Sequence, residues 1–158
     1  MKNLLAIGMV SLFMGMTTIS GLTPSASKDP GGDEAIRDRF AGAWRLAWLE
    51  QPGADGKLHR IDCCGMLVYT PDGHMSVQVM ERNPQTQASA YSQGGYEASY
   101  GRYEVDEHAH TFTFHVEGSL VRSLIGKDLL RVYEFSGNQL IVKSARPDEH
   151  WRVAWERY

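Results

Sequence analysis

The chain has 158 residues, of which 42% are apolar and 22% are charged, and its formal net charge is −3. These values are typical of one soluble globular domain, and they exclude a disordered chain, a collagen and a multi-span membrane protein. Because Lys and Arg form no basic run, we expect neither nucleic acid nor an anionic membrane surface as a partner.

The N-terminus has the features of a secretory signal peptide. Lys2 supplies a positive charge, and residues 4–16 are apolar apart from Ser11. This run is too short to span a bilayer, which needs about 20 residues, but it fits the apolar region of a signal. We predict a signal peptide over residues 1–27, cleaved after Ser27, and a periplasmic or secreted protein with no stable membrane anchor. An uncleaved N-terminal anchor is the alternative.

The predicted mature chain begins with a linker over residues 28–34, which are rich in Gly and acidic side chains. One barrel domain is expected over residues 35–158. It opens with a short helix over residues 35–41, where Ile36 and Phe40 are four residues apart and share a face.

After the helix, apolar residues recur with a period of two, which predicts β-strands. The alternating sets are Trp44, Leu46 and Trp48; Met66 and Val68; Met75, Val77 and Val79; Phe112, Phe114 and Val116; Leu140 and Val142; and Trp151, Val153 and Trp155. Turn-forming residues separate them at 54–56, 71–73, 136–138 and 146–148. Closure of a sheet removes its unpaired edges. We therefore predict an all-β fold, a single antiparallel up-and-down barrel of eight to nine strands.

Two longer segments interrupt the strands. Residues 82–97 are polar and rich in Gly, and residues 118–128 place a short apolar stretch between glycines. Long loops on a barrel often lie at its mouth and control access to the interior. The alternatives are a lid and a plain surface loop.

Several blocks of sequence resemble a family of bacterial and fungal lipocalin-like domain proteins. They are Gly42-Ala43-Trp44, which is similar to the G-x-W start of lipocalin-type barrels, and then residues 69–80, residues 100–120 and the terminal residues 155–158. The resemblance spans about residues 38–158 and implies an eight-stranded calycin-like barrel with a lumen. It also implies that Arg157 stacks on Trp44 and closes one end of the barrel, a contact worth about 0.5–2 kcal/mol. It implies no particular chemistry.

Polar residues on four strands are candidates for a ligand site in the lumen. His115 and Glu117 are two residues apart and project from the same face, so the carboxylate can orient the imidazole and raise its pKa. Polar faces point to solvent by default, and alternation alone does not say which face is inside. The predicted ligand-binding set is Ser76, Gln78, Tyr100, Arg102, His115, Glu117, Arg131 and Tyr133.

Two functions are consistent with these features. The first is an exported barrel that binds a small hydrophobic or aromatic molecule in its lumen, because an eight-stranded barrel is just wide enough for one small ligand. The alternative is a cofactor-independent isomerase, hydratase or cyclase, with His115 as general base, Glu117 as its orienting group, and Tyr100 or Arg131 stabilising negative charge. Neither function requires a cofactor.

Two further motifs are assigned to structure. His108 and His110 lie in an acidic turn without a third ligand at a recognisable spacing, so we predict no metal site. Cys63 and Cys64 are adjacent, and adjacent strand residues point to opposite faces, so we predict two free thiols. A vicinal disulfide that acts as a redox switch is the alternative.

Overall fold

The computed structural model describes residues 30–158. The predicted signal peptide and its cleavage site lie outside the described residues. A helix and nine strands, with one 3-10 turn, follow in chain order: α1 (Pro30–Phe40), β1 (Gly42–Pro52), β2 (Leu58–Ile61), β3 (Cys63–Tyr69), β4 (His74–Glu81), β5 (Tyr96–Asp106), β6 (Thr111–Ser119), η1 (Arg122–Leu124), β7 (Asp128–Ser136), β8 (Gln139–Ser144) and β9 (Arg152–Arg157).

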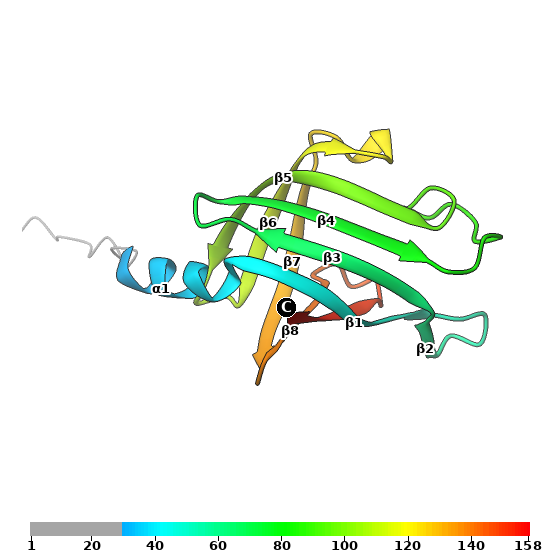
Figure 1. The fold of residues 1–158 in the computed structure, drawn as a ribbon, viewed down its shortest axis with the longest axis horizontal. Coiled ribbons are helices and arrows are strands. Elements are labelled where there is room, and N and C mark those ends of the chain that lie inside the picture. Colours follow the sequence, from blue (N-terminus) through cyan, green and yellow to red (C-terminus); the bar gives the residue numbers. More distant parts are fainter. Residues whose placement is uncertain (1–29) are drawn as a thin grey trace, which may run out of the picture.

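The strands form a closed antiparallel barrel (Figure 1). From β3 to β9 each strand pairs with the next one in the sequence, and β9 returns to pair with β1. The first half of β1 pairs with β3, and its second half pairs with the short extra strand β2. Eight strands therefore close the barrel and β2 extends it at one end, which confirms the predicted fold.

Helix α1 lies at the opposite end of the barrel from the β4–β5 loop (Figure 1). It begins at Pro30, so it includes residues that we predicted as linker. Proline is favoured at the first position of a helix because it has no N–H to leave unpaired there. Among residues 30–158, no helix is long and apolar enough to span a bilayer.

An aromatic cluster closes the end of the barrel next to α1. The Phe40 side chain is fully buried, and its ring centroid lies 4.9 Å from that of Tyr133 and 5.1 Å from that of Tyr69. The Trp44 indole N–H donates a 2.8 Å hydrogen bond to the Phe40 carbonyl, which fixes the helix to the first strand. The edge-to-face contacts of Phe40 with Tyr69 and Tyr133 add to the free energy gained by burying these rings.

The predicted contact between Arg157 and Trp44 is confirmed. The guanidinium carbon lies 4.4 Å from the centroid of the indole ring. The same guanidinium donates hydrogen bonds of 2.7 Å to the Arg39 carbonyl and 2.8 Å to the Ala41 carbonyl. Arg157 therefore joins the last strand to the end of α1 and covers the base of the barrel.

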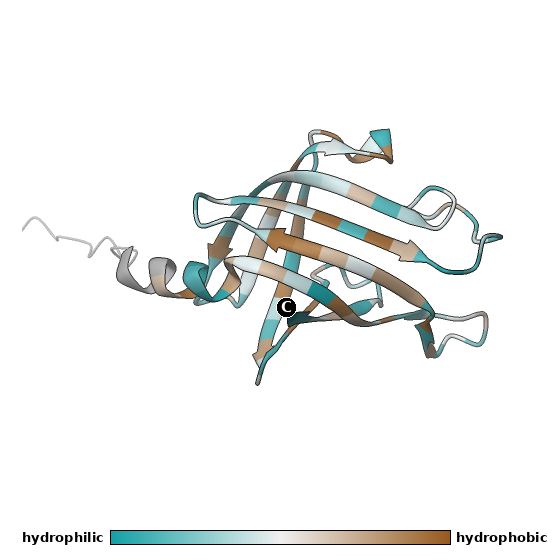
Figure 2. Cartoon of the chain, in the orientation of Figure 1, coloured by the Kyte–Doolittle hydropathy of each residue, from teal (hydrophilic) through white to brown (hydrophobic). Residues whose placement is uncertain are grey.

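Hydrophobic and hydrophilic residues alternate along the strands (Figure 2). The buried residues include the predicted apolar sets of β4, β6 and β8. In β3 the prediction is wrong, because Leu67 and Tyr69 are buried whereas Met66 is 39% exposed. Three of the four predicted turns lie between strands, and the turn at 136–138 begins at Ser136, the last residue of β7.

Candidate ligand-binding site

A cavity of about 120 Å³ lies inside the barrel. Its deeper part is bounded by Tyr69 and Phe112, which belong to the aromatic cluster next to α1. Aliphatic side chains from six strands line much of its wall: Leu49, Leu67, Met75, Val77, Val79, Leu129, Val142 and Val153. A largely apolar wall with a few polar groups is the usual character of a small-molecule site.

Three connections contribute to the other end of the cavity. The β4–β5 loop, residues 82–95, supplies Ser89, Tyr91 and Ser92, the segment before β9 supplies Trp151, and η1 supplies Leu124. The Tyr91 hydroxyl donates a 2.7 Å hydrogen bond to Glu149, and the two rings of Tyr91 and Trp151 have centroids 6.1 Å apart. The loop predicted as either a lid or a plain surface loop thus lies over the mouth of the barrel.

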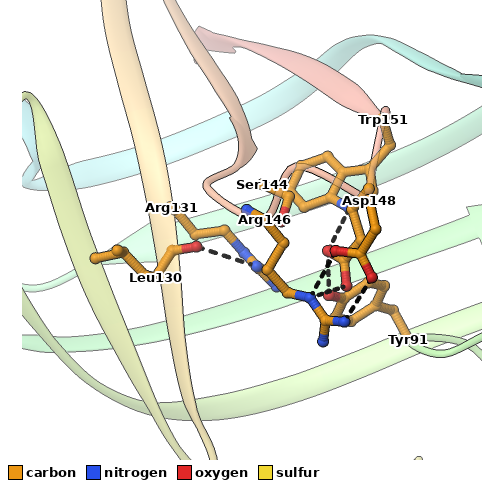
Figure 3. A network of polar contacts seen from close by, with 8 residues as sticks. Tyr91, Leu130, Arg131, Ser144, Arg146, Asp148 and Trp151 are labelled. Atoms are coloured by element: carbon orange, nitrogen blue, oxygen red, sulfur yellow. Dashed lines mark hydrogen bonds and ion pairs between the residues drawn. The ribbon is translucent and has the colours of Figure 1, made fainter.

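Arg131 reaches this mouth from β7 (Figure 3). Its guanidinium carbon lies 5.1 Å from the Tyr91 ring centroid and 5.0 Å from the Trp151 ring centroid. One terminal nitrogen donates a 3.3 Å hydrogen bond to the carbonyl of Leu130. Arg131 is only 7% exposed, so its charge lies in the cavity wall and not in bulk solvent.

Glu149 is held in the same network, next to the mouth. Burial disfavours its ionised form, but hydrogen bonds from neighbours that include Tyr91 and Trp151 outweigh that effect and lower its pKa. Arg146 adds an ion pair, with 3.4 Å between its Nε and a Glu149 oxygen. Glu149 is therefore an anion that holds the β4–β5 loop and the segment before β9 together.

Glu97 lies on the cavity wall, at the start of β5. Burial raises the pKa of its carboxyl to about 7, and the positive charge of Arg131 opposes this rise. Among the described residues its side chain forms no hydrogen bond or ion pair. A carboxyl with this pKa changes its charge near neutral pH.

Six of the eight predicted site residues do not line the cavity. Their strands place the apolar neighbours inward and the polar side chains outward, the default arrangement for alternating strands. The prediction of a lumenal position is therefore wrong for Ser76, Gln78, Tyr100, Arg102, His115 and Glu117. Four of them gather instead along a shallow groove on the outer surface of β4, β5 and β6: Ser76, Gln78, Tyr100 and Glu117.

The predicted His115–Glu117 pair does not form. The Nδ1 atom of His115 lies 2.7 Å from a carboxylate oxygen of Asp128, on the neighbouring strand β7. Glu117 is exposed on the outer surface. The histidine is therefore part of a surface ion pair, and the described residues place no imidazole in the cavity wall.

The other two predicted residues, Arg131 and Tyr133, do point into the barrel. Arg131 is 7% exposed and Tyr133 is 4% exposed. Leu130, the residue before Arg131, is 47% exposed on the outside. In β7 the order is thus reversed, with polar groups inside and an aliphatic residue outside. Arg131 lines the cavity, whereas the ring of Tyr133 packs against Phe40 below it.

Glu97 and Tyr91 are not among the predicted site residues, because both lie in the segment predicted as a loop. A signal for Glu97 was present. Counting back in steps of two from the buried residues Val105 and Tyr103 leads through Gly101 and Ser99 to Glu97. No comparable pattern points to Tyr91, since its position depends on how the loop folds over the mouth.

The two remaining motifs lie away from the cavity. Within residues 30–158, no group of three or more His, Cys, Asp and Glu side chains is placed to hold a metal ion. Cys63 and Cys64 are both free thiols, as predicted. Cys63 packs against the core cluster, and burial, with the nearby acidic Glu81, raises its pKa to about 11.

Comparisons with solved structures find similar chains at low sequence identity. A lipocalin-like protein from Bacteroides uniformis is 15% identical, with a TM-score of 0.46, 76% of this chain covered and 99% of that chain. An uncharacterized protein from Bacteroides eggerthii is 13% identical, with a TM-score of 0.44 and coverage of 75% and 99%. A mutant of the fluorescent protein UnaG is 13% identical, with a TM-score of 0.40 and coverage of 77% and 97%.

A search of curated protein sequences found no match. A family model, described as a lipocalin-like domain, matches residues 41–157, which begin just after α1 and include all nine strands. This match covers most of the chain, and the closed eight-stranded barrel agrees with it. The chain belongs to the lipocalin-like domain family.

Proposed function

We propose that this protein is an exported binding protein that holds one small, largely hydrophobic molecule in the lumen of its barrel. The observation that carries the proposal is the cavity of about 120 Å³, which apolar side chains line between the aromatic cluster and the loop-covered mouth. A packed interior leaves few voids larger than a water molecule, so a cavity of this size departs from ordinary core packing.

The size of the cavity favours a compact guest. An apolar cavity of about 150 Å³ in another protein binds benzene. Typical pockets for drug-sized ligands are larger, about 300–1,000 Å³. A molecule with one ring, or a hydrocarbon of similar bulk, is therefore the expected ligand class, and the aromatic residues at both ends of the cavity suit a flat ring.

The test compares a lumen-filling variant with a matched variant on the outer face of the same strand. Val79 lines the cavity, and Gln78 points outward beside it. Toluene should raise the unfolding temperature of the wild-type protein and of Gln78→Phe, because a ligand that binds only the folded state stabilises it. Val79→Phe should remove the shift by filling the cavity. Equal shifts in both variants would contradict lumenal binding.

The enzymatic alternative receives no support from the geometry, since His115 and Glu117 lie outside the barrel. Export is supported by the apolar run at residues 4–16 and the small residues that follow it. N-terminal sequencing of the protein recovered from its host tests this part. We expect Lys28 as the first residue, and a chain that still begins with Met1 would overturn the proposed cleavage.

A further inference from the structure

Arg131 carries a positive charge into the cavity wall, and this charge acts on the anionic Glu149 at the mouth without a direct ion pair. It is 7% exposed, and it forms no ion pair with any carboxylate among the described residues. The rings of Tyr91 and Trp151 contact its guanidinium, and one nitrogen donates to the Leu130 carbonyl. Those contacts offset part of the cost of burying the charge. They leave the remaining N–H groups of a five-donor side chain available to an acceptor.

Two other polar groups of the cavity wall are close enough to Arg131 for its charge to affect them. The Tyr69 hydroxyl is buried and has no hydrogen-bond partner among the described residues. Glu97 lies on the same wall and is also without a hydrogen bond. Burial raises the pKa of each group, and the positive charge of Arg131 opposes this rise in both. Both groups therefore lie close enough to Arg131 to feel its charge. Buried polar groups normally have partners, so this cluster requires an explanation.

A carboxylate from a ligand would supply what the cluster lacks. Guanidinium groups bind carboxylates through two parallel N–H donors, and this geometry is strong in a site that excludes water. The Tyr69 hydroxyl is a further donor. The aliphatic wall and the two rings at the mouth would take up the hydrocarbon part of the same molecule.

We propose that the lumen binds a compact monocarboxylic acid, with its carboxylate against Arg131 and its ring or branched hydrocarbon among the aliphatic side chains of the wall. This inference rests on the proposed lumenal binding function and specifies its ligand class. The cavity volume limits the acid to about one ring, because a long acyl chain would exceed the space available.

Glu97 should make the binding depend on pH. Two carboxylates beside one guanidinium repel each other, so the ligand should bind best when Glu97 carries its proton and donates a hydrogen bond. The charged and titratable groups that share this cavity wall are Arg131, Glu81, Tyr69 and Tyr91, and the anionic Glu149 lies beside them, bonded to Tyr91. Of these, Glu81 accepts a 3.1 Å hydrogen bond from Thr86. Affinity for the acid should therefore fall as the pH rises through 7.

The experiment is isothermal titration of the mature protein with benzoate, benzamide and toluene at pH 6. Benzoate should bind about tenfold or more tightly than benzamide, the ratio expected for one hydrogen bond between charged groups. Arg131→Met should remove this preference and keep toluene binding. Arg131→Lys retains the charge without the planar fork, so it should give an intermediate ratio of the two affinities. It serves as the test if the methionine variant does not fold. Arg102→Met, on the outer surface, is the matched control, and it should bind all three compounds with the wild-type affinities.

The outcomes separate this inference from the function on which it rests. Equal affinity for benzoate and benzamide, with toluene still bound, would overturn the carboxylate site and leave lumenal binding intact. Failure of all three compounds to bind would overturn both. Glu97→Gln supplies a second test, because it should bind benzoate with the same affinity at pH 6 and pH 8.5, whereas the wild-type affinity should fall several-fold. A wild-type affinity that stays constant over this range would contradict the role of Glu97.

Discussion

The hydroxyl of Tyr91 and the indole N–H of Trp151 donate to the same carboxylate oxygen of Glu149, at 2.7 Å and 3.4 Å. Tyr91 belongs to the β4–β5 loop, and the other two residues belong to the segment that leads into β9. This shared oxygen joins two connections that are 58 residues apart in the chain. The mouth of the cavity is therefore held closed by a small number of polar contacts, with Arg131 beneath the two rings.

Tyr91→Phe should loosen this closure without disturbing the barrel. The ring and its contact with Arg131 remain, but the hydrogen bond to Glu149 is lost, which should lower the free energy of unfolding by about 1–2 kcal/mol. Limited proteolysis should then cleave within residues 82–95 faster than in the wild-type protein. Tyr100→Phe is the control, because Tyr100 is 58% exposed on the outer surface. Equal cleavage of the two variants would show that the hydrogen bond does not hold the loop.

Glu97 should make the stability of the free protein depend on pH. Its pKa in the folded state is about 7, above its ordinary value of 4.5. Between these two values the folded state binds more protons than the unfolded state, so stability falls as the pH rises from 4.5 to 7 and levels off above that. Glu97→Gln should remove this slope. Between pH 5 and pH 8, the free energy of unfolding of the variant should rise by roughly 2–3 kcal/mol relative to that of the wild-type protein.

Urea unfolding at the two pH values measures this difference. Glu117→Gln is the matched control, since Glu117 is an exposed carboxylate on the adjacent strand β6. Its stability should follow the wild-type curve. Parallel curves for wild type and Glu97→Gln would mean that the Glu97 carboxyl is solvated in the folded protein, in contradiction to its position in the cavity wall.

The alternation of apolar and polar residues predicted most of the barrel. In a regular strand, burial of one face decides which alternate residues are apolar. Met75, Val77 and Val79 show this in β4, where the apolar set is the buried set. The pattern failed where the backbone is irregular. In β1 the register shifts between Leu46 and Trp48, so Trp48 turns outward and packs between two arginines, although it continues the period of Trp44.

The candidate site was harder to predict because polar character does not identify the inner face of a strand. His115 and Arg102 are neighbours on paired strands, and both are outside. Arg131 is inside, where two aromatic rings that come from distant connections offset part of the cost of its burial. Alternation along one strand carries no information about such contacts. Only the closure of the barrel and the fold of the loops bring Tyr91, Trp151 and Arg131 together.

Arg157 should contribute to stability by joining β9 to α1. Arg157→Ala removes the contact with the Trp44 ring and two hydrogen bonds to carbonyls, and the expected loss is about 1–3 kcal/mol of unfolding free energy. Thermal unfolding followed by circular dichroism measures the effect. Arg102→Ala, which removes an exposed arginine that forms no hydrogen bond or ion pair with any described residue, should cost much less. Equal losses would show that the contact at the barrel base is not stabilising.

The adjacent thiols of Cys63 and Cys64 should differ in reactivity, because they point to opposite faces of β3. Cys63 packs against the core with a pKa of about 11, so only about one thousandth of it is thiolate at pH 8, and the thiolate is the reactive form. In the folded protein, iodoacetamide should label the Cys63→Ser variant quickly and the Cys64→Ser variant slowly. Both variants should react at the same rate in denaturant, which serves as the control. Equal labelling of the folded variants would contradict the burial of Cys63, and an unreduced wild-type mass lower by two hydrogens would show a vicinal disulfide instead.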